Sequence, residues 1–194
     1  MRRQLVSSFL AVVLFTLLAG LAYPLAMTGV SQVVFPSAAN GSLLYLHGRV
    51  VGSALIGQSF LGSRGQPLPQ YFQPRPSASS YDALASGGSN LGPSSPSLAT
   101  SERQLAAAYR AFNQVPSSTL IPSDAVTSSG SGLDPDISIA NADLQAPRVA
   151  RTRGLALSTV LELIHSHTTP VVLGSLGEPV VNVLELNLAL DRRT

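Results

Sequence analysis

Serine and histidine are the side chains of this sequence that could support catalysis. Ser131 lies between Gly130 and Gly132, and a hydrolase would need it beside a histidine such as His165 and a carboxylate. Nucleophilic serines commonly stand in a G-x-S-x-G turn between a strand and a helix, whereas Leu133-Asp134-Pro135 follows here, which is typical of a loop. A structural turn is therefore the favoured interpretation, and a membrane-anchored exterior serine hydrolase is kept as an alternative.

Two histidines lie close enough in sequence to suggest a metal site. His165 and His167 are two residues apart, so they would not share a face of a helix. Both suit a helix C-terminus, where positive charge complements the helix dipole. The chain has no cysteine, which excludes disulfides, cysteine-ligated zinc and thiol catalysis. We expect no catalytic residue, no metal ligand and no cofactor bound directly.

The polar residues best suited to binding lie in a glycine-rich run and in an arginine cluster. Backbone N–H groups of the glycine-rich run could bind an anion, but the P-loop pattern is absent, so an ordered turn packed on a neighbour is favoured. The arginines would spread over more than one face of a helix, so each is first interpreted as a solvated residue. The two sets are Ser86, Gly87, Gly88, Ser89 and Asn90, and Gln145, Arg148, Arg151 and Arg153.

An apolar run at the N-terminus determines where these residues lie relative to a membrane. Residues 9–27 are nineteen in number, and no charged residue occurs between Arg3 and Arg49. A helix of that length spans about 28 Å, close to the roughly 30 Å hydrocarbon core of a bilayer. We expect a transmembrane helix over residues 7–28. A cleaved signal peptide with a site at Gly20-Leu21-Ala22 competes with it, but the run stays apolar beyond Ala22.

The flanking charges predict an orientation for this helix. Arg2 and Arg3 precede it, and the next cation is Arg49, so residues 1–6 should be cytoplasmic and residues 29–194 extracytoplasmic. Ala19, Ala22 and Ala26 would share one face of the helix, where small side chains permit close approach of another transmembrane helix.

Composition limits the class of the remaining domain. Charged residues make up only 11% of the chain, and all twelve cations are arginine. Ten arginines and ten acidic residues follow Val30, so the domain is formally neutral and offers no basic patch for nucleic acid. Its length suffices for one domain with a core of its own.

The first half of the domain contains few periodic segments. Two strands, residues 42–46 and 49–56, should form a hairpin around His47-Gly48. Residues 62–100 are rich in proline, serine and glycine and should be irregular, ordered by a partner that docks there. A helix should begin at Ser101, with Gln104 completing a capping box, and end near residue 114.

The second half should be mainly helical. A short helix capped by Ser138 should end near residue 144, and another should begin at Pro147 and run to about residue 165. Residues 180–186 should form a buried strand, although a final helical turn from Asn187 is equally compatible. The expected fold class is therefore α+β. The core-facing residues expected on the second helix are Val149, Leu157, Val160, Leu161 and Ile164.

Several collinear motifs resemble the C-subunit family of bacterial Kdp potassium-transporting ATPases. The resemblance covers nearly the whole chain and includes the single N-terminal span. Ser95, Asp136 and Ile139 depart from the usual residues of the family, which puts specific roles for these three positions in doubt. The matching motifs are Gly52 to Phe60, Arg75-Pro76-Ser77-Ala78 with Tyr81, Ser86 to Pro93, Pro122, Ser129 to Pro135, Gln145 with Arg148 to Arg151, Leu176 to Pro179, and Asn182 to Asp191.

The resemblance implies a single-pass accessory subunit in the bacterial inner membrane. Its partners would be membrane lipid, a channel-like potassium-binding subunit and a P-type ATPase subunit, in a complex that uses ATP, Mg²⁺ and K⁺. The family is described as a catalytic chaperone that raises ATP affinity, but an exterior domain cannot contact cytoplasmic ATP. A stand-alone surface binding module remains another alternative. The expected partner contacts are Arg75, Ser86, Gly87, Gly88, Ser89, Asn90, Gln145 and Arg148 in the domain and Ala19, Ala22 and Ala26 in the helix.

Overall fold

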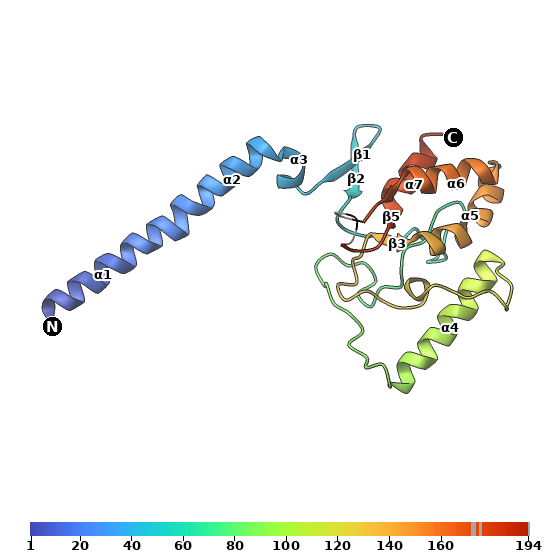
Figure 1. The fold of residues 1–194 in the computed structure, drawn as a ribbon, viewed down its shortest axis with the longest axis horizontal. Helices are drawn as coiled ribbons and strands as arrows, with labels where there is room; N and C mark the ends of the chain where they lie inside the picture. Colours follow the sequence, from blue (N-terminus) through green and yellow to red (C-terminus); the bar gives the residue numbers. More distant parts are fainter. Residues whose placement is uncertain (172–173, 175, 194) are drawn as a thin grey trace. The chain divides into compact units, whose positions relative to one another are not determined.

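The computed structural model describes residues 1–171, 174 and 176–193 and divides the chain into two units, residues 1–43 and 44–194 (Figure 1). The first unit contains a helix over Arg2–Val34 that is long and apolar enough to cross a membrane. The second unit combines helices with two small sheets. The predicted α+β class with one N-terminal apolar helix is confirmed.

The N-terminal helix contains a π-helical turn. Helix α1 (Arg2–Leu17) continues through η1 (Leu18–Ala22) into α2 (Tyr23–Val34), and a short α3 (Pro36–Ala39) follows. Pro24 has no N–H to donate to the carbonyl of the preceding turn, which accounts for the local change of pitch. The predicted alanine stripe assumed a regular α-helix, whereas Ala19 and Ala22 lie inside the π turn.

The predicted hairpin is confirmed, with a shorter second strand. Strands β1 (Leu43–Leu46) and β2 (Arg49–Ser53) form a two-stranded sheet. His47 and Gly48, between them, have φ angles of 50° and 77°, and two successive positive φ values match a type I′ turn. The strand ends at Ser53 because the chain then turns back, where Ser53 and Ile56 form an isolated bridge.

The second sheet is antiparallel and is built from distant segments. Its order is β3 (Asp136–Ser138), β5 (Val180–Asn182) and β4 (Thr168–Thr169). Ile137 and Thr168 both pair with Val181 of the central strand. The predicted strand over residues 180–186 is wrong after Asn182. There the Asn182 side chain accepts a hydrogen bond from the Glu185 N–H at 3.1 Å and so caps helix α7 (Val183–Asp191).

The predicted break at Pro147 is also wrong. One helix, α5 (Ile139–Arg153), passes through this proline. Proline removes one backbone hydrogen bond, and the buried side chains on either side, Ala146 and Val149, hold the helix against the core. The break comes at Gly154, whose φ of 66° ends α5 in the left-handed conformation. The Ser138 cap is confirmed, because its side chain accepts from the Asn141 N–H at 3.1 Å.

Helix α4 (Pro96–Asn113) begins five residues before the predicted start. Pro96 occupies the first turn, where a missing N–H costs nothing, and the capping box at Ser101 is not used. Gln114 ends the helix with a φ of 57°, close to the predicted end.

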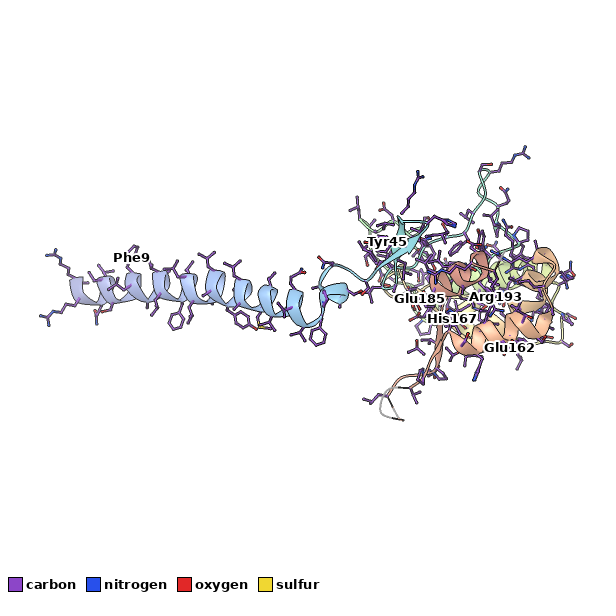
Figure 2. The ribbon with its side chains drawn as sticks, turned by 90° about the horizontal axis from the view of Figure 1, so that it is seen from above. Phe9, Tyr45, Glu162, His167, Glu185 and Arg193 are labelled. Carbon is purple, nitrogen blue, oxygen red and sulfur yellow. The ribbon has the colours of Figure 1, made fainter. Side chains whose placement is uncertain are left out.

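The core of the second unit lies between α5, α6 (Leu157–Ser166), α7 and the three-stranded sheet. Three of the predicted core residues are buried there, Val149, Val160 and Ile164. The prediction is wrong for Leu157 and Leu161, which are exposed because α6 presents its other face, including Leu163, to the core. Figure 2 labels Glu162 of α6 and His167, the C-cap of this helix.

Candidate functional site

A buried arginine on α5 lies at the centre of the candidate site. Arg148 is only 3% exposed. Its guanidinium donates to Asn113 Oδ1 at 2.8 Å, to the Tyr71 carbonyl at 3.0 Å and to the carbonyl of Pro69. Its Nη2 donates to Gln145 Oε1 at 2.9 Å. The interpretation of Arg148 as a solvated residue is therefore wrong, since α5 turns it into the domain.

The groups that accept hydrogen bonds from the Arg148 guanidinium are neutral. The four acceptors just named carry no formal charge, and the Arg148 Cζ lies 4.3 Å from the centroid of the Phe112 ring, a cation–π distance. Burial lowers the pKa of Arg148 to about 10, because the charged form loses hydration. The guanidinium thus stays protonated near neutral pH and joins α4, α5 and the segment around Tyr71.

Side-chain amides complete the hydrogen bonds of this irregular segment, residues 71–73. Gln145 accepts from the Gln73 N–H at 2.8 Å and donates to the Gln73 carbonyl at 3.0 Å. Asn187 accepts from the Phe72 N–H at 2.9 Å and donates to the Phe72 carbonyl at 3.0 Å. The two amides do here what a neighbouring strand does in a sheet. We call this arrangement, Phe72 and Gln73 with Gln145 and Asn187, the amide clamp.

The sequence showed only part of the amide clamp. The sequence pattern points to Gln145 as a polar group of the site, but not to Gln73 or Asn187. A lone amide between leucines, as in Leu186-Asn187-Leu188, is the signal that could have identified Asn187, because buried polar groups require partners. No feature of the neighbouring sequence identifies Gln73. It belongs to the site because its backbone N–H and carbonyl bond the Gln145 side chain.

The other two arginines of the cluster differ in environment. Arg151 is exposed, as predicted. Arg153 is not a solvated residue, since its side chain is 6% exposed and forms an ion pair with Asp191 at 2.7 Å. Its guanidinium also donates to the Gln70 carbonyl at 2.7 Å and lies over the Tyr71 ring. Arg153 therefore fixes the start of the same segment that Arg148 holds.

Arg75 lies two residues beyond this segment and is half-buried. Its Nη1 is 3.0 Å from Asp134 Oδ2. The Tyr81 hydroxyl donates to the Arg75 carbonyl at 2.6 Å. Burial, with the nearby Asp134 carboxylate, raises the pKa of Tyr81 well above its ordinary value. Tyr81 is therefore a hydrogen-bond donor at physiological pH and not an acid.

The glycine-rich run packs on residues 129–132. The Gly87 N–H and the Ser86 hydroxyl both donate to the Ser131 carbonyl, at 2.8 and 2.9 Å. A side chain at Gly132, whose φ is 68°, would meet the Gly87 carbonyl at 2.6 Å, so only glycine fits there. The expected packing of the run against a neighbouring segment is confirmed, although residues 86–91 form no turn.

A cavity of about 420 Å³ lies between α4 and the segment that the clamp holds. Its wall is mostly apolar, and the one charged side chain that lines it among the described residues is Arg75. The donor set does not fit a nucleoside triphosphate, because Arg75 is already paired with Asp134 and several negative charges would be left uncompensated. The lining residues are Ser59, Leu61, Pro67, Gln73, Pro74, Arg75, Pro76, Ser77, Ser80, Tyr81, Leu105, Ala108, Tyr109, Phe112, Asn113, Ala125 and Gln145.

The hydrolase alternative finds no support in the geometry around Ser131. The Ser131 hydroxyl oxygen accepts from the Leu133 N–H at 3.1 Å and lies 3.4 Å from the Ser129 hydroxyl. His165 is exposed in the last turn of α6, and His167 follows as its C-cap, as expected for histidines at a helix C-terminus. The part of the chain that the structure describes holds no cluster of potential metal ligands.

The predicted contact residues range from buried to exposed, and Arg75, Gly87 and Gly88 are half-buried. Gln145 and Arg148 are buried and bonded within the domain, whereas Ser89 and Asn90 are exposed. Ala19, Ala22 and Ala26 are exposed on the apolar helix. Partner contact by any of them stays a prediction, and the buried pair has a clear internal role.

Comparison with known proteins shows the family to which this chain is similar. The family model described as "KdpC: K+-transporting ATPase, c chain" matches residues 5–192. A "Potassium-transporting ATPase KdpC subunit" of Mycobacterium tuberculosis strain H37Rv is 52% identical over 194 residues, covering 99% of this chain and all of the relative. Proteins of the same name from Beijerinckia indica and Caulobacter vibrioides NA1000 are 51% and 55% identical. They cover 96% and 93% of this chain and 92% and 88% of the relatives' lengths.

Proposed function

Because the chain belongs to the KdpC family, the c chain of K⁺-transporting ATPases, we propose that it is a non-catalytic accessory subunit that assembles or stabilises the pump. Its partners in this proposal are the channel-like potassium-binding subunit and the ATP-hydrolysing subunit. ATP, Mg²⁺ and K⁺ are then handled by those subunits. The candidate site of this chain serves to shape a surface for its neighbours.

The observation that carries the proposal is the exposed apolar helix over Arg2–Val34. None of its most apolar part is buried by the rest of the described chain, and side chains such as Phe9 project outward from it (Figure 2). Removing apolar surface from water is favourable by about 25 cal/mol per Å². Lipid and the transmembrane helices of other subunits are the surroundings that would cover it.

We propose the orientation that the flanking arginines favour. Residues 1–6 are cytoplasmic, residues 7–28 span the membrane and residues 29–194 form the extracytoplasmic domain. Arg2 and Arg3 before the helix support this orientation through the positive-inside bias. Any influence of the domain on ATP affinity then passes through the membrane subunits, as a coupling free energy between distant sites.

Co-purification tests the proposal. The chain, tagged at its C-terminus and extracted in a mild detergent, should retain two larger membrane polypeptides and a K⁺-stimulated ATPase activity. Ala22→Phe should reduce this retention to background, because a large side chain prevents close helix approach. Leu21→Phe, at the neighbouring position, is the control and should retain the partners. A chain that elutes alone under the same conditions would contradict the proposal.

A stand-alone binding module is the second candidate, and the cavity beside α4 favours it. Its volume of about 420 Å³ lies within the range of small-molecule sites. This candidate predicts a stable monomer without co-purifying membrane polypeptides, so the same extraction distinguishes the two functions.

A further inference from the structure

Large apolar side chains are exposed on the β1–β2 hairpin. Tyr45 and Val50 are each 54% exposed, and Leu55, just after β2, is 63% exposed. The two-residue turn between the strands places Tyr45 opposite Val50, so both lie on one face of the sheet. Figure 2 shows Tyr45 at the outer edge of the domain.

The base of this hairpin is fixed to the domain. A side chain at Gly52 would lie 2.6 Å from Leu184 Cδ2, so the backbone packs closely on α7 at this point. Asn182 Nδ2 donates to the Ala54 carbonyl at 2.8 Å, just beyond the strand. A two-stranded hairpin is marginally stable in water by itself. Its exposed tip, with Tyr45 and Val50, therefore gains from a second surface.

The chain keeps this hairpin close to the end of the apolar helix. Helix α2 ends at Val34 and β1 begins at Leu43. The residues between them can extend by no more than about 30 Å. This limit follows from the covalent chain and holds for every placement of the domain. If the helix spans a membrane, the hairpin is within reach of the bilayer interface, so the inference depends on the anchoring proposed above.

The distribution of charge along the chain indicates that the surface contacted by the hairpin is anionic. The first acidic residue of the chain is Asp82, and three arginines lie between the apolar helix and Asp82, namely Arg49, Arg64 and Arg75, of which Arg75 pairs with Asp134. From Asp82 onward, the chain holds seven arginines and all ten acidic residues. Arg49, at the tip of the hairpin, is exposed and belongs to the purely cationic part. Anionic phospholipid headgroups attract such segments.

We propose that the β1–β2 hairpin lies in the membrane interface. Tyr45 and Val50 contact the boundary between headgroups and acyl chains, and Arg49 contacts lipid phosphates. Tyrosine suits this position because its ring is apolar and its hydroxyl is polar. The hairpin gives the domain a second attachment to the bilayer and limits its motion about the helix.

Tryptophan fluorescence tests the contact, since the chain has no tryptophan of its own. The full chain carrying Tyr45→Trp is reconstituted without partners into vesicles of phosphatidylcholine and phosphatidylglycerol. Brominated lipids should quench this tryptophan, and aqueous iodide should quench it about twofold less than Leu120→Trp, given the apolar environment of the interface. Leu120 is the control because it is 91% exposed and lies in a distant loop.

Two further measurements make the test decisive. Phe15→Trp, within the apolar helix, and flotation of the vesicles report anchoring alone. If the chain floats and brominated lipids quench Phe15→Trp, but iodide quenches Tyr45→Trp as strongly as Leu120→Trp, the hairpin proposal fails and the anchor stands. If the chain does not float, both fail. Protection of Tyr45→Trp that requires added partner subunits would also overturn the proposal, because the surface would then be protein.

The role of the headgroup charge is tested separately. In the Tyr45→Trp background, Arg49→Gln should reduce the protection from iodide in vesicles with phosphatidylglycerol and leave it unchanged in vesicles of phosphatidylcholine alone. An equal protection with and without Arg49 in the anionic vesicles would overturn the phosphate contact.

Discussion

At the scale of single residues, Arg148 is the buried charge of the domain that requires the most hydrogen-bond acceptors. A buried charge is costly unless it is bonded, and here the acceptors are two backbone carbonyls and the side chains of Asn113 and Gln145. The planar guanidinium can reach several acceptors at once, which a lysine ammonium cannot do in the same geometry. Arg148 therefore connects three segments that are far apart in sequence.

Arg148→Leu should lower the free energy of unfolding by about 3 kcal/mol, because it leaves several buried acceptors without donors. Arg148→Lys should lower it by less, since one donor group remains. Urea denaturation of the full chain in detergent, followed by near-ultraviolet circular dichroism, measures both. Arg151→Leu is the control, since Arg151 is exposed and bonds only the exposed Gln114 side chain among the contacts described. Equal midpoints for Arg148→Leu and Arg151→Leu would contradict this assignment.

Asp136 gives a prediction for the dependence of stability on pH. Burial, followed by the charges of Asp134 and Glu185, raises its pKa above the ordinary 3.8, although a hydrogen bond with Asn182 opposes the shift. The folded state thus holds this proton more tightly than the unfolded state. The resulting stability is present below pH 3.8 and is lost as the pH rises through the raised pKa of the folded state.

Asp136→Asn should therefore raise the urea midpoint at pH 7, and the gain should shrink as the pH falls below the raised pKa. The midpoint is measured at several pH values for both proteins. Glu162→Gln, at an exposed position of α6, serves as the control. If the gain in urea midpoint instead increased toward low pH, the prediction would be wrong. Asp136 stands where the family resemblance led us to expect histidine, so this cost belongs to a departure from the family pattern.

At the scale of elements, the amide clamp explains how residues 71–73 are held without a strand partner. Docking on a partner is expected to order residues 62–100 as a whole, and that expectation stays a prediction. Within this proline-rich region, residues 72 and 73 receive hydrogen bonds from α5 and α7 of the same domain. Regular structure is not required for order when side chains supply the missing donors and acceptors.

Gln145→Leu should accelerate hydrogen exchange at the Gln73 amide, because that N–H loses its acceptor. Asn187→Leu should do the same at the Phe72 amide. Peptides covering residues 71–73, analysed by mass spectrometry, report both effects. Peptides of α6 serve as the internal control and should change little. Uniform acceleration in every peptide would indicate global destabilisation and contradict a local clamp.

At the scale of the whole molecule, the apolar helix decides where the domain can act. The absence of cysteine from the chain permits clean single-cysteine labelling. In sealed right-side-out vesicles, a membrane-impermeant maleimide should label Leu120→Cys and not Gln4→Cys, because the arginines beside residue 4 favour the cytoplasmic side. Permeabilised vesicles provide the control, in which both should react. Labelling of Gln4→Cys alone would reverse the proposed orientation.

The sequence by itself determined the local features of this protein. The apolar run, the hairpin turn at His47-Gly48 and the Ser138 cap depend on neighbouring residues, and the structure confirms an apolar helix, the turn and the cap. The collinear motifs likewise identify the family without reference to the tertiary structure. Local backbone chemistry and composition are sufficient for such features.

Only the tertiary structure decided which polar residues lie inside the domain. Gln145 bonds a segment 72 positions away in sequence, and Asn187 bonds one 115 positions away. Helix α5 passes through Pro147 because of burial that no local pattern records, and Arg148 is interior for the same reason. Hydrogen-bond partners that are distant in the chain become neighbours only when the core forms, so a local pattern does not distinguish a buried arginine from a solvated one.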